Sequence, residues 1–186
     1  MHFVYVNSLL LFVSLMVSMS SYAQNLSIRD NLYLTEMKKY SKYKRCIYDA
    51  AKLYQVDEWI LMAVVRHEDG PPHGFLKNPN GTKDYGLTCI NDVRFEDLKR
   101  EGFGHITPQL VMKDPCLAIH TAAYFLKVEE FKENQRSGST DWLTVAGNYH
   151  YNYRGDFPHN HHAYVEKIRN VLKRMERATL NFIAKK

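Results

Sequence analysis

Beyond its N-terminal end, the sequence has no apolar run long enough to cross a membrane. The apolar run that is present, within residues 3–17, is shorter than the roughly 20 residues that a membrane-spanning helix needs. Residues 1–23 end in the small residue Ala23, as before a cleavage site, although their N-terminal part carries His2 and no Lys or Arg and so lacks the usual positive charge. This pattern favours a secretory signal peptide over residues 1–23, cleaved after Ala23, above an uncleaved membrane anchor.

The sequence also has no internal repeat and no domain linker. Residues 24–186 have the length of one domain, so we expect a single domain there. They carry the whole formal net charge of +5, because residues 1–23 are uncharged. An exported basic domain suits an anionic polymer of the cell envelope better than cytoplasmic nucleic acid. We expect a periplasmic protein that does not bind nucleic acid.

Cysteine is scarce, with single residues at positions 46, 89 and 116. Export permits a disulfide, and three cysteines allow three pairings, each of which leaves one thiol free. We favour the pair Cys46–Cys116, because both residues fall on predicted helices. No His and Asn partner pattern surrounds Cys89, so we expect a buried free thiol there rather than a catalytic nucleophile.

A metal-binding motif is also missing. His67-Glu68 begins like the zinc motif His-Glu-x-x-His, but Pro71 stands where the second His is required. Three histidines within residues 159–162 have the chemistry to bind zinc. Since no nearby acid or Cys completes that set of ligands, we expect a partly charged loop over a cleft there, and no metal ion.

The spacing of apolar residues predicts a mainly α-helical domain. Asp57 has the side chain of an N-cap, and Gly70 ends the helix that Asp57 opens. Thr107-Pro108 and Asp114-Pro115 each combine a cap with a proline at the first helical position. Helices are expected over residues 46–54, 58–67, 95–100, from 108, 115–133, 142–149 and 164–175.

One segment lacks the helical period. Within residues 73–91, Gly, Pro and Asn mark turns, and residues 85–90 are expected to pair as a short strand. We expect a polar lead-in with some helix over 24–43, the domain over 44–175, and a basic tail over 176–186 in which the last helix frays. The predicted domain is mainly α, with one small irregular or β segment after its second helix.

Glu68 is the first candidate for chemistry, because it stands where the second predicted helix ends and is followed by Asp69. The negative end of the helix dipole and the neighbouring carboxylate both disfavour its ionisation and raise its pKa. A Glu that keeps its proton near neutral pH can protonate the leaving oxygen of a glycosidic bond. Asp84 offers a second acid in the turn-rich segment, although an Asp near Gly81 can instead hydrogen-bond its own backbone.

Four short motifs follow one another along the chain. They are Glu68 at a helix end, Asn80-Gly81-Thr82-Lys83-Asp84-Tyr85-Gly86-Leu87 with Ile90-Asn91, Asp114-Pro115-Cys116, and Gly147-Asn148-Tyr149-His150. In this order they resemble the lysozyme-like soluble lytic transglycosylases, above all the small exported members associated with conjugation, type IV secretion, and pilus or invasion systems. The resemblance covers about residues 46–172 and implies a lysozyme-like α+β fold. In such small members the cysteine of Asp-Pro-Cys pairs with one before the first helix, which fits Cys46–Cys116.

The resemblance implies that Glu68 is the acid/base that protonates the oxygen between N-acetylmuramic acid and N-acetylglucosamine. In a lytic transglycosylase the resulting carboxylate takes the proton of the muramic C6 hydroxyl and closes a 1,6-anhydro ring; in a hydrolase it activates water. Asp84 matches the second carboxylate of animal lysozymes. It would stabilise the oxocarbenium-like transition state or act as the nucleophile of a retaining pair, whose carboxyl groups lie about 5–5.5 Å apart.

The resemblance also implies a glycan-binding groove. The residues expected to contact substrate are Tyr85, Ile90, Asn91, Tyr149 and His150. Peptidoglycan glycan strands are the implied substrate, and components of a secretion, conjugation or pilus apparatus are the implied partners. No metal or organic cofactor is implied, and we expect a monomer.

Three positions depart from the pattern of this family. Thr88 and Cys89 replace a Met and a Gln, and Asp69 stands where Ser or Gly is usual. Cys hydrogen-bonds a sugar only weakly, and a charge at position 69 would raise the pKa of the acid beside it. Two alternatives therefore stay open: a lysozyme-type muramidase that uses Asp84 as its second carboxylate, and a weakly active peptidoglycan-binding assembly protein.

Overall fold

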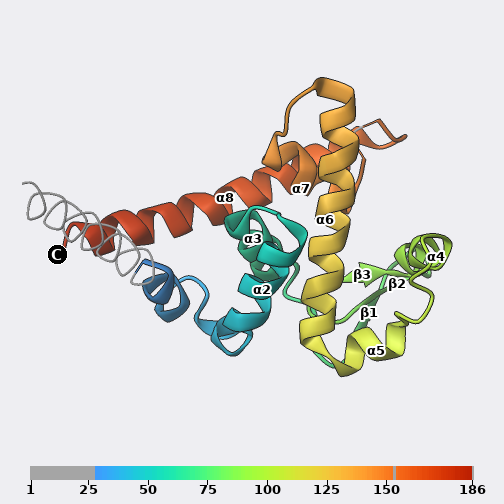
Figure 1. The fold of residues 1–186 in the computed structure, drawn as a ribbon, viewed down its shortest axis with the longest axis horizontal. Coiled ribbons are helices and arrows are strands. Elements are labelled where there is room, and N and C mark those ends of the chain that lie inside the picture. The colour runs from blue at the N-terminus through green and yellow to red at the C-terminus, as the bar shows by residue number, and fades with distance from the viewer. Residues whose placement is uncertain (1–27, 153, 186) are drawn as a thin grey trace, which may run out of the picture. The chain divides into compact units, whose positions relative to one another are not determined.

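The computed structural model describes residues 28–152 and 154–185. The signal peptide predicted over residues 1–23 lies outside the described residues. The described part of the chain is mainly α-helical, with one small antiparallel sheet of three strands (Figure 1). This confirms the predicted fold class, a mainly α, lysozyme-like α+β fold with a small β segment after the second helix of the domain.

The chain divides into two compact units. The larger unit comprises Lys39–Arg174, and the smaller one combines the described residues before Lys39 with those from Met175 onward. The order of elements is η1 (Lys38–Tyr43, a 3₁₀ helix), α2 (Lys44–Tyr54), α3 (Glu58–Glu68), β1 (Phe75–Lys77), β2 (Lys83–Tyr85), β3 (Ile90–Asn91), α4 (Asp92–Arg100), α5 (Pro108–Lys113), α6 (Pro115–Ser137), α7 (Trp142–His150) and α8 (Pro158–Ile183). Helix α8 begins in the larger unit and ends in the smaller one.

Four helices begin at the side chains that the sequence marks as caps. At the start of α3, the carboxylate of Asp57 accepts a hydrogen bond from the backbone N–H of Ile60 (3.0 Å). Thr107 and Asp114 likewise cap α5 and α6. Asp141 caps α7, just before the helix expected over residues 142–149. Each such cap stabilises its helix by about 1 kcal/mol, so local chemistry fixes where these helices begin.

Helix α3 lies at the centre of the larger unit. Every residue from 60 to 65 is buried, and the helix packs against α2, α6 and α7. Helix α6 runs between α2 and α3 on one side and the sheet and α4 on the other (Figure 1). The predicted disulfide between Cys46 and Cys116 is present and ties α2 to the first turn of α6. Glu68, the last residue of α3, therefore extends from a buried and well-packed helix.

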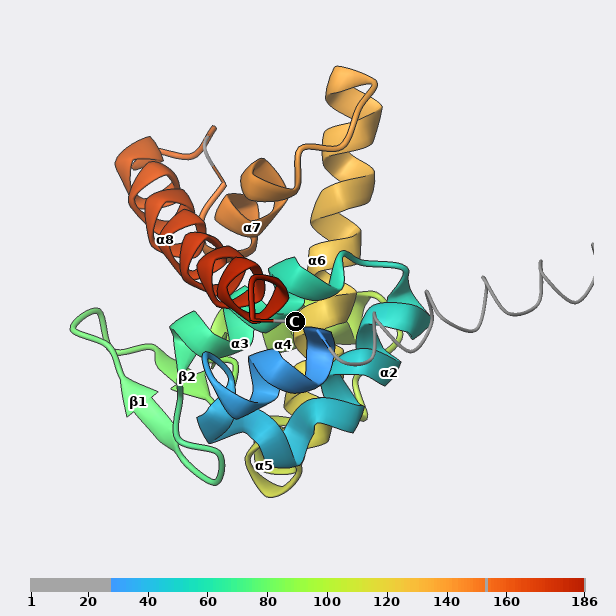
Figure 2. The same ribbon diagram turned by 90° about the vertical axis from the view of Figure 1, so that its left-hand side faces the viewer.

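The sheet follows directly on α3, and its strand order is β1-β2-β3. Figure 2 shows β1 and β2 of this sheet. The central strand β2 pairs antiparallel with both neighbours, which places Asp84 opposite Asn91 of β3. The expectation of a single strand over residues 85–90 is wrong. The chain turns between β2 and β3, where Gly86 and Cys89 adopt positive φ angles of 69° and 50° that a strand cannot contain.

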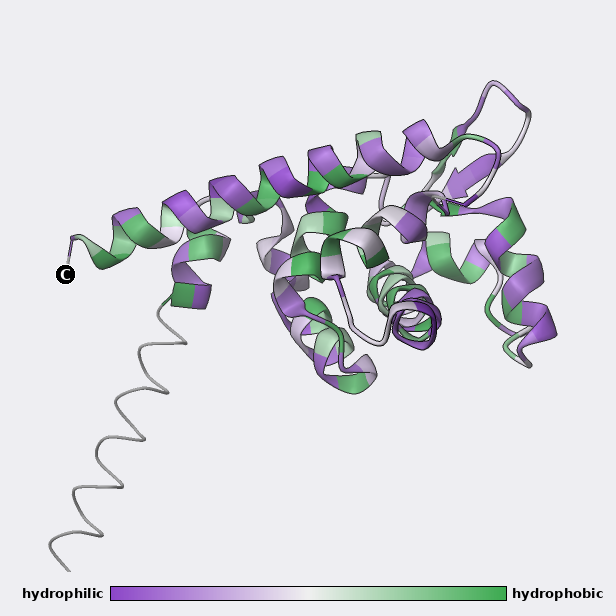
Figure 3. Cartoon of the chain, turned by 90° about the horizontal axis from the view of Figure 1, so that it is seen from above, coloured by the Kyte–Doolittle hydropathy of each residue, from purple (hydrophilic) through white to green (hydrophobic). Residues whose placement is uncertain are grey.

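The last helix differs from the prediction at both ends. It was expected over 164–175 with a frayed tail after it, but α8 runs over Pro158–Ile183, and polar and apolar residues alternate along it (Figure 3). Proline at the first helical position opens the helix, and no Gly or Pro interrupts residues 176–183. The histidines within 159–162 therefore lie on the first turns of α8, and the expectation of a loop there is wrong.

The smaller unit contains the start of the predicted lead-in. Residues 28–34 are helical, and Leu32 and Met175 are buried. Asn31 Nδ2 donates a hydrogen bond to the carbonyl oxygen of Ala178 (3.3 Å), which joins the two segments of this unit. None of the helices in the described part of the chain is long and apolar enough to cross a membrane.

Candidate active site

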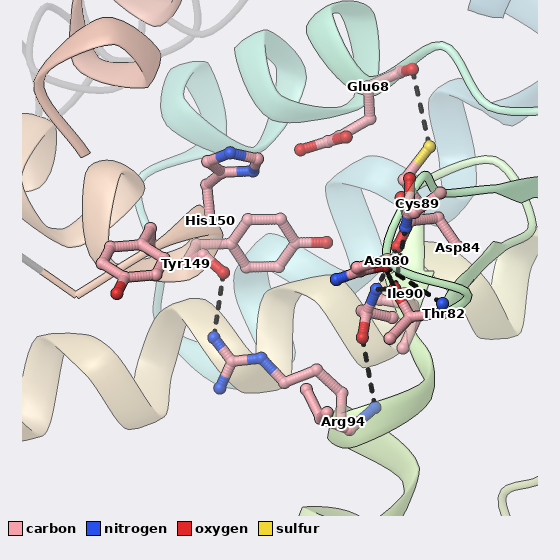
Figure 4. A pocket seen from close by; sticks show the side chains of 13 residues that line it. Glu68, Asn80, Thr82, Asp84, Cys89, Ile90, Arg94, Tyr149 and His150 are labelled. Atoms are coloured by element: carbon pink, nitrogen blue, oxygen red, sulfur yellow. Dashed lines mark hydrogen bonds between the residues drawn. The ribbon is translucent and has the colours of Figure 1, made fainter. Parts of the chain in front are cut away.

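A cavity of about 440 Å³ lies where the end of α3, the sheet and the end of α7 meet (Figure 4). Its lining consists of Glu68, Asn78, Asn80, Thr82, Asp84, Cys89, Ile90, Asn91, Val93, Arg94, Tyr149, His150 and Tyr151. All the residues predicted for catalysis or substrate contact are among them, with the exception of Tyr85. The structure thus gathers in one place residues that are widely separated in the sequence.

Glu68 projects from the end of α3 into this cavity (Figure 4). Asp84 and Cys89 lie on one side of it, and Tyr149 and His150 of α7 lie on the other. Its Oε1 atom accepts a hydrogen bond of 2.6 Å from the hydroxyl of Tyr164 on α8. Its backbone carbonyl oxygen lies 3.6 Å from the Sγ atom of Cys89, which donates to it. The acid is therefore fixed through its side chain and through its backbone.

The surroundings raise the pKa of Glu68 to about 7. Burial of the carboxyl group is the largest cause, because it disfavours the charged form. The hydrogen bond from Tyr164 acts in the opposite direction, and the negative charge of Asp84 raises the pKa further. The direction expected from the sequence is confirmed, but the charge responsible belongs to Asp84 and not to the neighbouring Asp69.

Asp84 lies on β2, and both of its carboxylate oxygens are engaged. Oδ2 accepts a hydrogen bond from Asn78 Nδ2 (2.9 Å), and Oδ1 accepts one from Asn91 Nδ2 (2.6 Å). The same two amides donate to the hydroxyl oxygen of Thr82, each at 3.1 Å. Two side-chain amides from either side of β2 thus hold Asp84 in one orientation. Asn78 and Thr82 were missed from the sequence, where they read as turn residues.

Tyr149 lines the cavity, but its hydroxyl is already hydrogen-bonded within the protein. Its hydroxyl donates to the carbonyl oxygen of Thr88 (2.8 Å), and only 7% of the residue is exposed. Its own carbonyl oxygen accepts a hydrogen bond from Arg94 (2.9 Å), a bond that Figure 4 marks at the lower edge of the site. Arg94 also forms an ion pair with Glu129 of α6 (3.8 Å), so it links α4, α6 and α7.

Tyr164 is a further residue of the candidate site that the sequence motifs do not indicate. It is 2% exposed, and its apolar spacing on α8 marks it as a core residue. A buried Tyr hydroxyl usually has a hydrogen-bond partner, however. A tyrosine among the apolar residues of this helix therefore indicates a polar group near its hydroxyl. The ring of His150 stacks on Tyr164 with centroids 4.6 Å apart, and His67 contacts it edge-on at 5.0 Å. His150 thereby contributes to holding the hydroxyl that binds Glu68.

Tyr85 does not reach the cavity. Neighbouring residues of a strand point to opposite faces, so Tyr85 faces away when Asp84 faces the cavity. Its ring packs against Phe95 (5.5 Å between centroids) and Phe75 (5.9 Å). It supports the sheet from behind and does not line the cavity, and its contact with substrate stays a prediction.

The two departures at positions 88 and 89 have structural consequences. Thr88 is fully buried, and its hydroxyl donates to the carbonyl oxygen of Ala118 (2.9 Å). It therefore joins the turn between β2 and β3 to α6. Cys89 is a free thiol, as predicted, but it is half-buried rather than buried and lines the cavity. Burial, and then the charges of Glu68 and Asp84, raise the pKa of its thiol, which keeps it protonated and poorly nucleophilic.

Within the described residues, no group of three or more His, Cys, Asp and Glu side chains is placed to hold a metal ion. His161, one of the three clustered histidines, has a packing role. It is 3% exposed, its Nδ1 atom lies 3.1 Å from the carbonyl oxygen of Tyr151, and its ring lies directly against Gly147 of α7.

Comparison with known proteins gives a partial match. No protein-family model matches the chain. Over 82 residues the chain is 32% identical to the protein IpgF of Shigella flexneri, a stretch that covers 44% of this chain and 52% of that protein. The same figures hold for IpgF of Shigella sonnei. The chain therefore spans about half the length of the curated relatives that it matches.

Proposed function

We propose that this protein is a peptidoglycan lytic transglycosylase, which cleaves the β-1,4 bond between N-acetylmuramic acid and N-acetylglucosamine. The observation that carries the proposal is Glu68, a carboxyl group with a pKa of about 7 that shares one cavity with a second, firmly held carboxylate, Asp84. An acid with this pKa is still partly protonated near neutral pH and can therefore deliver a proton. The ordered motifs of the sequence supply the substrate class.

Tyr164 determines which oxygen of Glu68 delivers the proton. Because the Tyr164 hydroxyl donates to Oε1, the proton of the neutral carboxyl group resides on Oε2. In the proposed reaction Oε2 protonates the glycosidic oxygen as the bond to C1 of the muramic residue breaks. The Glu68 carboxylate then takes the proton of the C6 hydroxyl, and the C6 oxygen bonds to C1. The 1,6-anhydro ring forms without consumption of water, and Glu68 regains its proton.

Asp84 has an electrostatic role in this proposal. Positive charge develops at C1 and the ring oxygen in the transition state. A carboxylate that two amides already hold in place stabilises this charge without reorganising during the reaction. No metal or organic cofactor takes part in the proposed chemistry.

Digestion of purified peptidoglycan sacculi tests the proposal. Wild-type protein and the Glu68→Gln variant are compared, and the ends of the released fragments are identified by mass spectrometry. We expect anhydro-muramyl ends from the wild type and a loss of at least about a thousandfold in the variant, because Gln has the shape of Glu but no proton to deliver. Equal release by both proteins would show that Glu68 is not the acid.

A lysozyme-type muramidase is the second candidate, because a second carboxylate, Asp84, lines the same cavity as Glu68. In that case water would accept the glycosyl group, and the fragments would carry reducing ends. Asp84→Asn, included in the same digestion, separates the two candidates further. It would abolish a reaction that uses Asp84 as nucleophile, whereas a transglycosylase would keep part of its rate.

The biological setting belongs to the same proposal. A monomeric enzyme in the periplasm would open the wall locally for a secretion, conjugation or pilus apparatus, as the resemblance to small exported transglycosylases implies. The local similarity to IpgF supports kinship with that protein over half its length. If neither wild type nor variant releases fragments while both bind sacculi, the peptidoglycan-binding assembly protein replaces the enzyme.

A further inference from the structure

The residue that follows Glu68 is held by a segment far from the cavity in sequence. The carboxylate of Asp69 accepts hydrogen bonds from Lys39 Nζ at 2.5 Å (Oδ1) and 2.7 Å (Oδ2). The hydroxyl of Tyr40 lies 2.6 Å from Oδ1 of Asp69 and 3.3 Å from the carbonyl oxygen of Arg66. Since a hydroxyl has a single proton, the shorter contact is the donated bond. Element η1 thus contacts the last turn of α3 through side chains.

The Tyr40 bond is the stronger of the two attachments. Tyr40 is 4% exposed, so its hydroxyl has lost water and depends on Asp69. The side chain of Lys39 is 67% exposed and that of Asp69 40%, and an ion pair in contact with water contributes little. The buried hydroxyl therefore anchors Asp69, while Lys39 supplies the compensating charge.

The backbone of Asp69 needs such an anchor. Asp69 has a φ of 46° and a ψ of 32°, a left-handed conformation that is strained for a residue with a side chain. Its N–H donates to the carbonyl oxygen of Val65 (3.3 Å), which closes the last turn of α3. The side-chain bonds to Tyr40 and Lys39 offset the strain and fix the direction in which the chain leaves Glu68.

The residue after Asp69, Gly70, is fixed as firmly. The N–H of Gly70 donates to the carbonyl oxygen of Leu87 (3.0 Å), and a Cβ atom on Gly70 would lie 2.2 Å from the carbonyl oxygen of Gly86. Residues 68–70 are thus confined between η1 and the turn that joins β2 to β3. A displacement of Asp69 would move Glu68 relative to Tyr164 and the cavity.

We propose that Asp69 and Tyr40, supported by Lys39, form a clamp that positions Glu68 for proton transfer. The inference rests on the proposed function of Glu68 as acid/base. None of these three side chains lines the cavity, so they act as positioning residues and do not contact substrate. The segment before α2 thereby becomes part of the catalytic apparatus, although its sequence reads as a polar lead-in.

The clamp also explains why Asp69 does not disturb the acid beside it. Partial burial would raise the pKa of Asp69, but the hydrogen bonds from Lys39 and Tyr40 outweigh burial and lower it. The carboxylate is ionised and already neutralised by Lys39. The carboxylate of Asp69 thus binds Lys39 and Tyr40 and does not point into the cavity with Glu68.

Two variants test the clamp with the full exported chain and a defined glycan substrate. Asp69→Gly removes both side-chain bonds but suits the left-handed backbone, so the fold is expected to keep its melting temperature. Tyr40→Phe removes the buried hydroxyl alone. For each we expect kcat to fall about tenfold with KM within about twofold of wild type, because a misplaced acid slows the chemical step more than it weakens binding.

The matched control is Tyr43→Phe. Tyr43 belongs to the same 3₁₀ helix and is buried, but its hydroxyl has no hydrogen-bond partner among the described residues, so this variant should keep the wild-type kcat. Asp69→Asn keeps an acceptor for Tyr40 and should retain more activity than Asp69→Gly. Wild-type kcat in both Asp69→Gly and Tyr40→Phe would overturn the clamp. If wild type itself cleaves no glycan, the proposed function fails instead, a result separate from the failure of the clamp.

Discussion

At the residue scale, opposing influences set the proton affinity of Glu68. Burial raises its pKa most, Asp84 adds to this increase, and the hydrogen bond from Tyr164 restrains it, with a result of about 7. Burial without the opposing hydrogen bond would favour the protonated form more strongly. The hydrogen bond from Tyr164 stabilises the ionised carboxylate, which the proposed reaction needs when Glu68 acts first as acid and then as base.

A pH profile of Tyr164→Phe tests this balance. In the proposed reaction Glu68 must carry a proton to donate to the glycosidic oxygen. Wild-type activity should therefore be present below about pH 7 and lost as the pH rises through that value. Removing a hydrogen bond that favours the charged form raises the pKa of Glu68, and the loss of activity should move to higher pH. We expect kcat to fall about tenfold as well, because the carboxyl group loses its orientation.

The measurement is kcat/KM against pH for wild type, Tyr164→Phe and Tyr149→Phe. The hydroxyl of Tyr149 bonds Thr88 and not Glu68, so its removal should leave the alkaline limb in place. An alkaline limb that stays at the wild-type pH in Tyr164→Phe would contradict a direct effect of Tyr164 on the acid.

At the element scale, the site depends on how closely α7 and α8 pack. Gly147 of α7 lies against the ring of His161 on α8, and a Cβ atom there would lie 2.3 Å from Cε1 of the ring. His161 has no room to yield, since it is buried and hydrogen-bonded to Tyr151. This contact sets the distance between α7, which carries Tyr149 and His150, and α8, which carries Tyr164.

Gly147→Ala should therefore destabilise the fold by about 1–3 kcal/mol, the usual range for an overfilled core. Thermal unfolding followed by circular dichroism measures the loss. Gly104→Ala is the control, because a Cβ atom at position 104 meets only ordinary contacts, 3.5 Å from a side-chain carbon of Lys99. Replacing His161 with Ala in the Gly147→Ala background should restore most of the stability. No loss in Gly147→Ala would mean that the two helices can separate without cost.

Elements whose signals are local were predictable from the sequence, and those that depend on distant partners were not. Caps such as Asp57 and Asp114 act on residues two or three positions away, so their helices began as predicted. The bond between Tyr164 and Glu68 spans 96 positions, and no local pattern announces it. The face of the sheet on which Tyr85 lies follows from strand register, which the turn-rich sequence left undetermined.

At the scale of the whole molecule, one covalent bond closes about half of the larger unit into a loop. The disulfide between Cys46 and Cys116 joins positions separated by 70 residues, and the segment between them contains α3, the sheet and both carboxylates of the site. Cross-linking a loop of this length restricts the unfolded chain and stabilises the folded one by about 4 kcal/mol in the chain-entropy description. Export to an oxidising compartment would let the bond form and persist.

Reduction of this bond should lower the melting temperature by roughly 10 °C, given how strongly the melting point of a domain of this size depends on its stability. The double variant Cys46→Ser/Cys116→Ser should melt at the lower temperature with or without reductant, because Cys89 has no partner to lose. Differential scanning calorimetry of both proteins, with and without dithiothreitol, makes the comparison. If the melting temperature of the wild type does not change with dithiothreitol, the packing of α2 against α6 stabilises the fold without the disulfide. A lowered melting temperature would instead show that oxidation of Cys46 and Cys116 stabilises the segment that carries Glu68 and Asp84.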